Sequence, residues 1–189
     1  MRARIKGGLV LAALVAAAGC AEPMTAPVDD SWFNASIEGA VMSEYSGAGH
    51  FYQFTRSLAP WPVPWLLIST NGNQRFELLH RSGGLPEVGV HELRLPVDVD
   101  DPPPFLANYI RVEGGHEDRY MAVAGEVEVT ESTAERVSGT FRFTAERRAV
   151  CTSSGSNFRS CEGTLEEDPP VIEVSGSFEA APFRGRLGF

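Results

Sequence analysis

Hydrophobic positions recur at every second residue over much of this chain. The clearest runs are 126–130, 137–145 and 172–180, where Val, Ile, Phe, Ala or Gly alternates with Glu, Ser, Thr or Arg. Shorter runs of the same kind occupy 33–38 and 51–56. Such alternation is typical of β-strands that bury one face and expose the other to water. We therefore predict that these segments are strands of an antiparallel sheet.

Turn residues separate further apolar runs. Asn71-Gly72 stands between the runs 65–70 and 75–80, and this spacing predicts a β-hairpin. Gly114-Gly115 predicts a second hairpin in the same way, with His116, Glu117 and Asp118 in the apparent turn.

Helical periodicity is weak throughout the chain. The best helical candidate, 131–136, is about one turn long. A further short strand is expected at 89–95. The pattern predicts an all-β fold, a single antiparallel β-sandwich or closed barrel of about 8–10 short strands over residues 32–189.

The first twenty residues follow a different pattern. Arg2, Arg4 and Lys6 precede a stretch, 7–18, that is apolar or glycine, and the stretch ends at Cys20. A helix needs roughly 18 or more apolar residues to span a bilayer, so this stretch is too short for a membrane anchor. Residues 1–19 are therefore expected to be an export signal peptide.

The end of this signal, Ala17-Ala-Gly-Cys20, resembles the lipobox of bacterial lipoproteins, with Ala17 where that family most often has Leu. The resemblance implies that the Cys20 sulfur receives a diacylglycerol, that the preceding peptide is cut, and that an acyl chain such as palmitate joins the new amino terminus. Residues 20–31, which contain prolines and acids without periodicity, are expected to be a flexible tether. Ala21 follows the cysteine, which in enteric lipoproteins favours the outer membrane, if the host has one.

The net charge of the mature domain limits the classes of partner that it can bind. The chain has 16 basic and 25 acidic residues, and removal of residues 1–19 takes away three of the basic ones, which leaves a formal charge of −12. Nucleic acid is disfavoured as a partner of so acidic a domain. The remaining 170 residues are enough for one domain with a core of its own.

Two cysteines remain when Cys20 is acylated. Cys151 and Cys161 are an even pair in an oxidising compartment, and the nine residues between them are rich in turn formers. We expect a disulfide between them. A metal or catalytic pair is the alternative, but such a site needs additional Cys or suitably spaced His ligands, and the sequence offers none nearby.

The order of short elements along the domain is similar to that of a family of bacterial lipoproteins of unknown function. That family has, after a lipobox, the elements F-x-A-x-[IV]-[ND]-G, G-x-Y-x-L, A-x-Y, G-x-[IV]-x-[IV]-T, [IV]-S-G-T-F-x-F-x-A and G-x-F. The matching segments are 33–39, 89–93, 107–109, 125–130, 137–145 and 174–178, with His91 where the pattern usually has Tyr. The resemblance implies a β-rich, membrane-tethered domain and carries over no catalytic residue.

Residues with catalytic or metal-binding chemistry are scattered. His50, His80, His91 and His116 show no metal-ligand spacing, and the acidic run 98–101 lacks the glycine turn and distal Glu of a calcium loop. Glu126, Glu128, Glu173 and Glu179 fall on the polar faces of expected strands, where charged residues are common, although a glycosidase needs only two facing carboxylates. We expect no cofactor, no metal and no enzymatic activity.

Aromatic residues in proline-rich segments are the candidate contact site. Trp61-Pro-Val-Pro-Trp65 holds two indoles between prolines, and Phe105 follows a second proline run. Rigid aromatic side chains at a surface are typical anchors for ligands or partners. The alternative is that these rings close one end of the β core.

Together these patterns favour a lipid-anchored domain of the cell envelope with a non-enzymatic binding or structural role. Its expected partners are the membrane, through the lipid on Cys20, and an envelope protein or glycan. Two alternatives stay open. The C-terminal run ending in Phe189 resembles the last strand of small outer-membrane β-barrels, and paired carboxylates would suit a carbohydrate-active enzyme.

Overall fold

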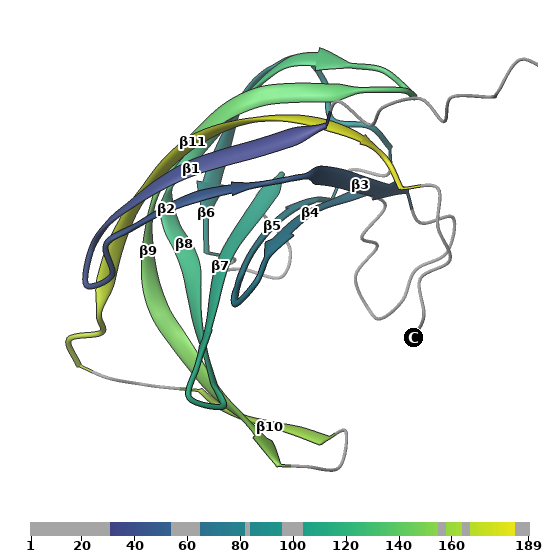
Figure 1. Ribbon diagram of the computed structural model, residues 1–189. Helices are drawn as coiled ribbons and strands as arrows, with labels where there is room; N and C mark the ends of the chain where they lie inside the picture. The colour runs from purple at the N-terminus through teal and green to yellow at the C-terminus, as the bar shows by residue number, and fades with distance from the viewer. Residues whose placement is uncertain are drawn as a thin grey trace, which may run out of the picture.

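The computed structural model describes residues 31–53, 65–81, 84–95, 104–154, 158–163 and 167–183. Within these ranges the chain forms eleven β-strands and no helix, and all the strands belong to one sheet (Figure 1). The strands are β1 (Trp32–Gly39), β2 (Ser43–Gly47), β3 (Gly49–Gln53), β4 (Trp65–Asn71), β5 (Gln74–His80), β6 (Gly89–Arg94), β7 (Phe105–Glu113), β8 (His116–Ser132), β9 (Val137–Ser154), β10 (Phe158–Gly163) and β11 (Val171–Pro182). The prediction of an all-β fold is confirmed.

The sheet closes on itself. Its strand order is β10-β9-β8-β6-β7-β5-β4-β3-β11-β1-β2, and an additional antiparallel pairing of β9 with β11 joins the two halves into a ring. Strand β3 completes the ring by lying between β4 and the end of β11. Closure leaves fewer unpaired strand edges than an open sheet of the same size.

Strands β8 and β9 are much longer than the sequence predicted, with 17 and 18 residues. Each is long because it changes partners along its length: the first part of β8 pairs with β7 and its later part with β6. Where the partner changes, the register with β9 shifts between Ala122 and Ala124, and Gly125, at the start of the later part, has φ 146°, so β8 bends there. A Cβ on Gly125 would lie 2.3 Å from the carbonyl oxygen of Arg142, which leaves no room for another residue.

The alternation predicted for β1, β9 and β11 is confirmed. The apolar members of these strands are buried, and most of the polar members are exposed. The buried side chains are Phe33, Ala35, Ile37, Val137, Phe141, Phe143, Ala145, Ile172, Val174, Phe178 and Ala180.

Aromatic rings from opposite walls fill the interior of the ring. Phe33 of β1 lies 5.0 Å from Phe76 of β5 and 5.1 Å from Phe141 of β9, measured between ring centroids. Tyr45 and Tyr109 contact Phe76 at 4.9 and 5.0 Å. The interior is therefore a packed core of side chains, as in other small closed sheets.

Both predicted hairpins are present. Asn71 pairs with Gln74 across a two-residue turn, and Glu113 pairs with His116 across Gly114-Gly115. One other prediction was wrong: His116, Glu117 and Asp118 belong to β8, because their backbones pair with β7 and β9. Residues 131–136, the best helical candidate in a chain expected to be all-β, form no helix, because β8 runs to Ser132 and a turn leads directly into β9.

Side chains bridge the space between β2 and β4, where no backbone ladder forms. The Asn71 amide donates to the carbonyl of Ser46 at 2.6 Å, and the Ser69 hydroxyl donates to the carbonyl of Ala48 at 2.6 Å. Since that proton is already donated, the Tyr45 hydroxyl donates to Ser69 Oγ at 2.8 Å. We call these contacts the β2–β4 seam. They satisfy backbone groups that an edge strand would otherwise expose.

Candidate functional site

The candidate residues from the sequence lie in different parts of the chain. Cys20 and Trp61 lie outside the described residues, as does the acidic run 98–101. Trp65 begins β4, and only its backbone is described. Its backbone lies directly opposite His80, which in turn lies opposite Phe105, so the strand register places Trp65 and Phe105 in one row across β4, β5 and β7.

Phe105 needs a correction. It begins β7 with an exposed fraction of 0%, so it is a core residue and not a surface contact. Its ring lies 4.8 Å from that of His80 and 5.1 Å from that of His91. The alternative interpretation, an aromatic ring that closes one end of the core, is the correct one for this residue.

The two histidines around Phe105 are held by the turn that precedes β6. His80, the last residue of β5, is buried, and its Nδ1–H donates to the carbonyl of Gly84 at 3.3 Å. The Nε2–H of His91 donates to the carbonyl of Glu87 at 2.7 Å. The ring centroids of the two histidines are 6.2 Å apart. We call His80, His91 and Phe105 the histidine cluster.

Burial lowers the pKa of His80 below its ordinary value, and the nearby His91 lowers it further. The hydrogen bond to Gly84 and the charge of Glu87 act in the opposite direction and are outweighed. His80 is therefore neutral at physiological pH. Within the histidine cluster, the buried His80 therefore resists protonation and takes up a proton only when the pH becomes acidic.

The sequence contained no signal for the histidine cluster. His80 and His91 are eleven positions apart, and neither spacing nor composition connects them. The strand pairing makes the connection, because Phe105 lies directly opposite His80 on one side and Leu93 on the other. His91 lies two residues before Leu93 and hence on the same face of β6.

A second polar group lies at the other end of β5 and β7. The Tyr109 hydroxyl donates to Gln74 Oε1 at 3.0 Å, and the Gln74 amide donates to Ser43 Oγ at 3.2 Å. The pKa of Tyr109 is raised to about 12, chiefly by burial; Arg111 acts to lower it and the neighbouring Tyr120 acts to raise it. Tyr109 thus keeps its proton and serves as a hydrogen-bond donor.

The arginines beside this group are already matched to carboxylates. Arg111 pairs with Glu113, and Arg147 Nη1 lies 3.7 Å from Asp118 Oδ1. Three of the four carboxylates considered for glycoside chemistry are engaged in a similar way. Glu126 pairs with Arg142 at 3.0 Å, Glu179 pairs with Arg136 at 3.1 Å, and Glu173 accepts the Thr144 hydroxyl. Ion pairs and hydrogen bonds of this kind are common on the solvated outer face of a sheet.

The two cysteines of the predicted disulfide lie in neighbouring strands. Cys151 of β9 is directly opposite Cys161 of β10, and Cys151 is buried. Residues opposite each other in an antiparallel pair have Cα atoms about 4.5 or 5.5 Å apart, and both separations fall within the range that a disulfide spans. On the other side of Cys151 lies Glu117, which accepts a hydrogen bond from Arg119 Nε at 2.7 Å.

Comparison with known proteins gives no relative: no protein family, curated protein or solved structure matches the chain. Among the described residues, no helix is long and apolar enough to cross a membrane, and no three His, Cys, Asp or Glu side chains are grouped to hold a metal ion.

Proposed function

We propose that this protein is a lipid-anchored β-domain of the cell envelope, with a non-enzymatic role in binding or envelope structure. The observation that carries the proposal is the N-terminal sequence, in which basic residues, a short apolar run and Ala17-Ala-Gly-Cys20 precede the sheet that begins at Trp32. Each buried CH₂ of an acyl chain contributes about 0.8 kcal/mol, so two or three chains on Cys20 tether the domain durably. The outer membrane is the proposed location if the host has one.

Two features of the fold support a binding or structural role. Aromatic side chains occupy the interior of the ring, and three carboxylates of its outer face, those of Glu126, Glu173 and Glu179, are engaged with arginines or a hydroxyl. Both arrangements stabilise a rigid domain. An envelope protein or a glycan is the proposed partner of its outer surface.

A disulfide between Cys151 and Cys161 is part of the proposal. Their direct opposition in the β9–β10 hairpin and the burial of Cys151 support it. The bond would hold together the hairpin that extends from the body of the sheet, visible as β9 and β10 in Figure 1.

Acyl labelling of the full chain tests the anchor. Cells that express the protein are fed a labelled fatty acid, and the label is followed on the purified chain. The wild type should be labelled and processed, whereas Cys20→Ser should lose both label and processing because the sulfur is the acyl acceptor. Cys161→Ser is the matched control and should keep the label. A labelled Cys20→Ser protein would refute the anchor.

The binding role is tested at the two proline-flanked indoles. If Trp61 and Trp65 contact a partner, Trp61→Ala and Trp65→Ala should leave the free energy of unfolding nearly unchanged and weaken capture of that partner. If both indoles are instead buried, each substitution should cost about 3–5 kcal/mol. Large losses from both would remove these residues as a binding site.

A further inference from the structure

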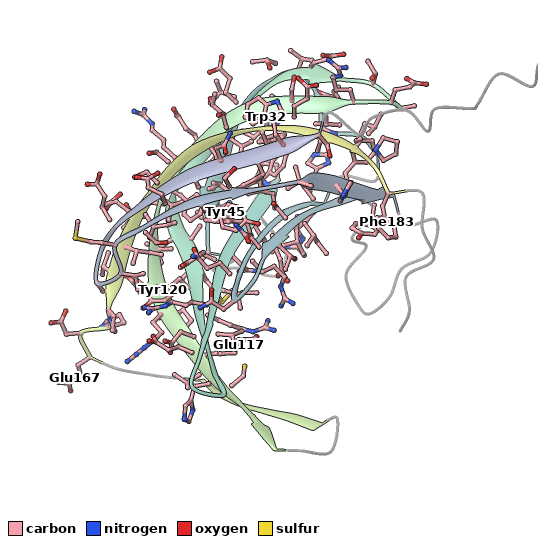
Figure 2. All side chains as sticks on the ribbon, in the orientation of Figure 1. Trp32, Tyr45, Glu117, Tyr120, Glu167 and Phe183 are labelled. Atoms are coloured by element: carbon pink, nitrogen blue, oxygen red, sulfur yellow. The ribbon has the colours of Figure 1, made fainter. Side chains whose placement is uncertain are left out.

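We infer that one end of the ring rests on the lipid surface through Trp32, Tyr52 and Phe183, which we call the aromatic rim. The inference rests on the proposed lipid anchor and adds to it the surface that faces the bilayer. The proposed binding partner of the aromatic rim is the interfacial region of a phospholipid membrane. Trp32 and Phe183 are labelled in Figure 2.

The strand register places the three rings on the outer face. Phe33, Phe51 and Ala180 point into the core, so side chains at odd steps from them point outward. Trp32 precedes Phe33, Tyr52 follows Phe51, and Phe183 lies three positions after Ala180. The exposed fractions of Trp32 and Phe183 are 39% and 37%.

The three residues also lie at the same end of the sheet. Ala180 of β11 pairs with Gly49 of β3, and a Cβ placed on Gly49 would lie 3.1 Å from the carbonyl oxygen of Trp32. In Figure 1 the start of β1, the end of β11 and β3 accordingly lie together at the right of the view.

Phe183 is held in place against β3. Its backbone N–H donates to the carbonyl of Phe51 at 2.9 Å. Its ring lies 4.7 Å from that of Tyr52 and 5.9 Å from that of His50. A preorganised cluster of this kind loses little conformational entropy when it meets a surface.

The short tether limits the distance between the membrane and the end of the sheet that carries the aromatic rim. Trp32 is the twelfth residue after Cys20, and a chain of that length spans at most about 40 Å, with a root-mean-square reach of about 20 Å when flexible. A lipid on Cys20 therefore keeps the first strand close to the bilayer. Trp32, a member of the aromatic rim, is the first residue of β1 and so lies where the tether meets the sheet.

Side-chain chemistry favours lipid as the occupant. Trp and Tyr concentrate where membrane meets water, because one part of the ring system is apolar and another forms hydrogen bonds. The charges beside the rim offset each other, since Glu179, which lies opposite Trp32, pairs with Arg136. With a mature charge of −12, the domain should dock through its aromatic rings and not through attraction to anionic lipid.

Quenching by brominated lipid tests the inference without requiring native acylation. Residues 21–189, which include every described strand, are held by an N-terminal hexahistidine on phosphatidylcholine vesicles that contain nickel-chelating lipid. Trp61→Phe and Trp65→Phe leave Trp32 as the only tryptophan. Brominated acyl chains should then quench Trp32 several-fold more strongly than a tryptophan placed by Val90→Trp in a Trp32→Phe background. Val90, on β6, has an exposed fraction of 64% and serves as the matched position.

A second measurement retains all three native tryptophans. Amide hydrogen exchange at 49–53 and 181–183 should slow when the tethered protein is on vesicles, and Phe183→Ser should reduce the slowing. Equal quenching of Trp32 and the control tryptophan, with unchanged exchange, would overturn the inference. The inference would also be overturned if amide exchange at these positions slowed without vesicles and slowed more at higher protein concentration. The aromatic rim would then contact a second copy of the chain. Acyl labelling of Cys20 is read separately, so failure of the anchor and failure of the docking surface are distinguishable.

Discussion

Phe178 of β11 lies directly opposite Gly139 of β9, and the tip of its ring is 3.2 Å from the point where a Cβ on Gly139 would stand. Phe141 and Gly176 repeat the relationship two residues away with the strands exchanged. Each phenylalanine covers a glycine on the partner strand, which protects the backbone there and lets the strands curve. This reciprocal pair lies at the β9–β11 contact that closes the ring.

Gly176→Ala should therefore destabilise the fold. Its Cβ would lie 2.2 Å from the carbonyl oxygen of Asn34 and 2.5 Å from the ring of Phe141, and overpacking of this kind typically costs about 1–3 kcal/mol. Urea unfolding of the mature chain measures the loss. Gly84→Ala is the control, because nothing lies within 4 Å of its Cβ position. Equal stability of the two variants would contradict the glycine–aromatic pairing.

The β2–β4 seam should contribute measurably to stability. Ser69→Ala removes the acceptor of the buried Tyr45 hydroxyl and the donor to Ala48, and a buried polar group left without a partner costs about 1–3 kcal/mol. Thr70→Ala, at the exposed neighbouring position, should change little. The free energies of unfolding of the two variants are compared in urea. A neutral Ser69→Ala would mean that the seam does not hold β2 in place.

Acid should weaken the fold through His80. The pKa of His80 is lowered in the folded state, so below its ordinary value of 6.5 the unfolded chain binds a proton that the folded chain resists. Stability from this group is present above about pH 6.5 and falls as the pH decreases below it. Unfolding between pH 8 and pH 5 should show less pH dependence for His80→Asn than for wild type. His116→Asn, at an exposed histidine, should behave like wild type.

The exported chain should contain no free thiol at positions 151 and 161. Its intact mass should be two hydrogens below that of the reduced chain, and Cys151→Ala and Cys161→Ala should each cost about 3 kcal/mol, since both remove the same loop constraint. Similar losses from the two variants would support one shared bond. Free thiols that titrate in the native protein would contradict it.

The mature chain without its lipid should be monodisperse in the absence of detergent. Exposed polar side chains such as Arg142, Glu128 and Glu173 line the outer face of β8, β9 and β11, where they are solvated. Size-exclusion chromatography and circular dichroism of residues 21–189 check this. A chain that requires detergent would favour the alternative of an outer-membrane β-barrel, and hydrolysis of a glycan by the soluble chain would favour a carbohydrate-active enzyme.

Features that depend on neighbours along the chain could be predicted from the amino-acid sequence. Alternation at 137–145 and 172–180 set which side chains face the core, because successive residues of a strand point to opposite faces. The turns at Gly72 and Gly114-Gly115 were predictable because few residues adopt a positive φ, and these glycines have values of 58° and, at Gly115, 85°.

Which distant strands pair with each other became clear from the folded chain alone. The closure of β9 on β11, the change of partner along β8 and the meeting of His80 with His91 around Phe105 all depend on strand register. Phe105 illustrates the limit: its place after a proline run suggested a surface contact, yet its pairing with His80 and Leu93 buries it completely. Strand register is set by the packing of all inward-facing side chains together. No local stretch of sequence contains this information, because the packing partners lie on strands that are distant along the chain.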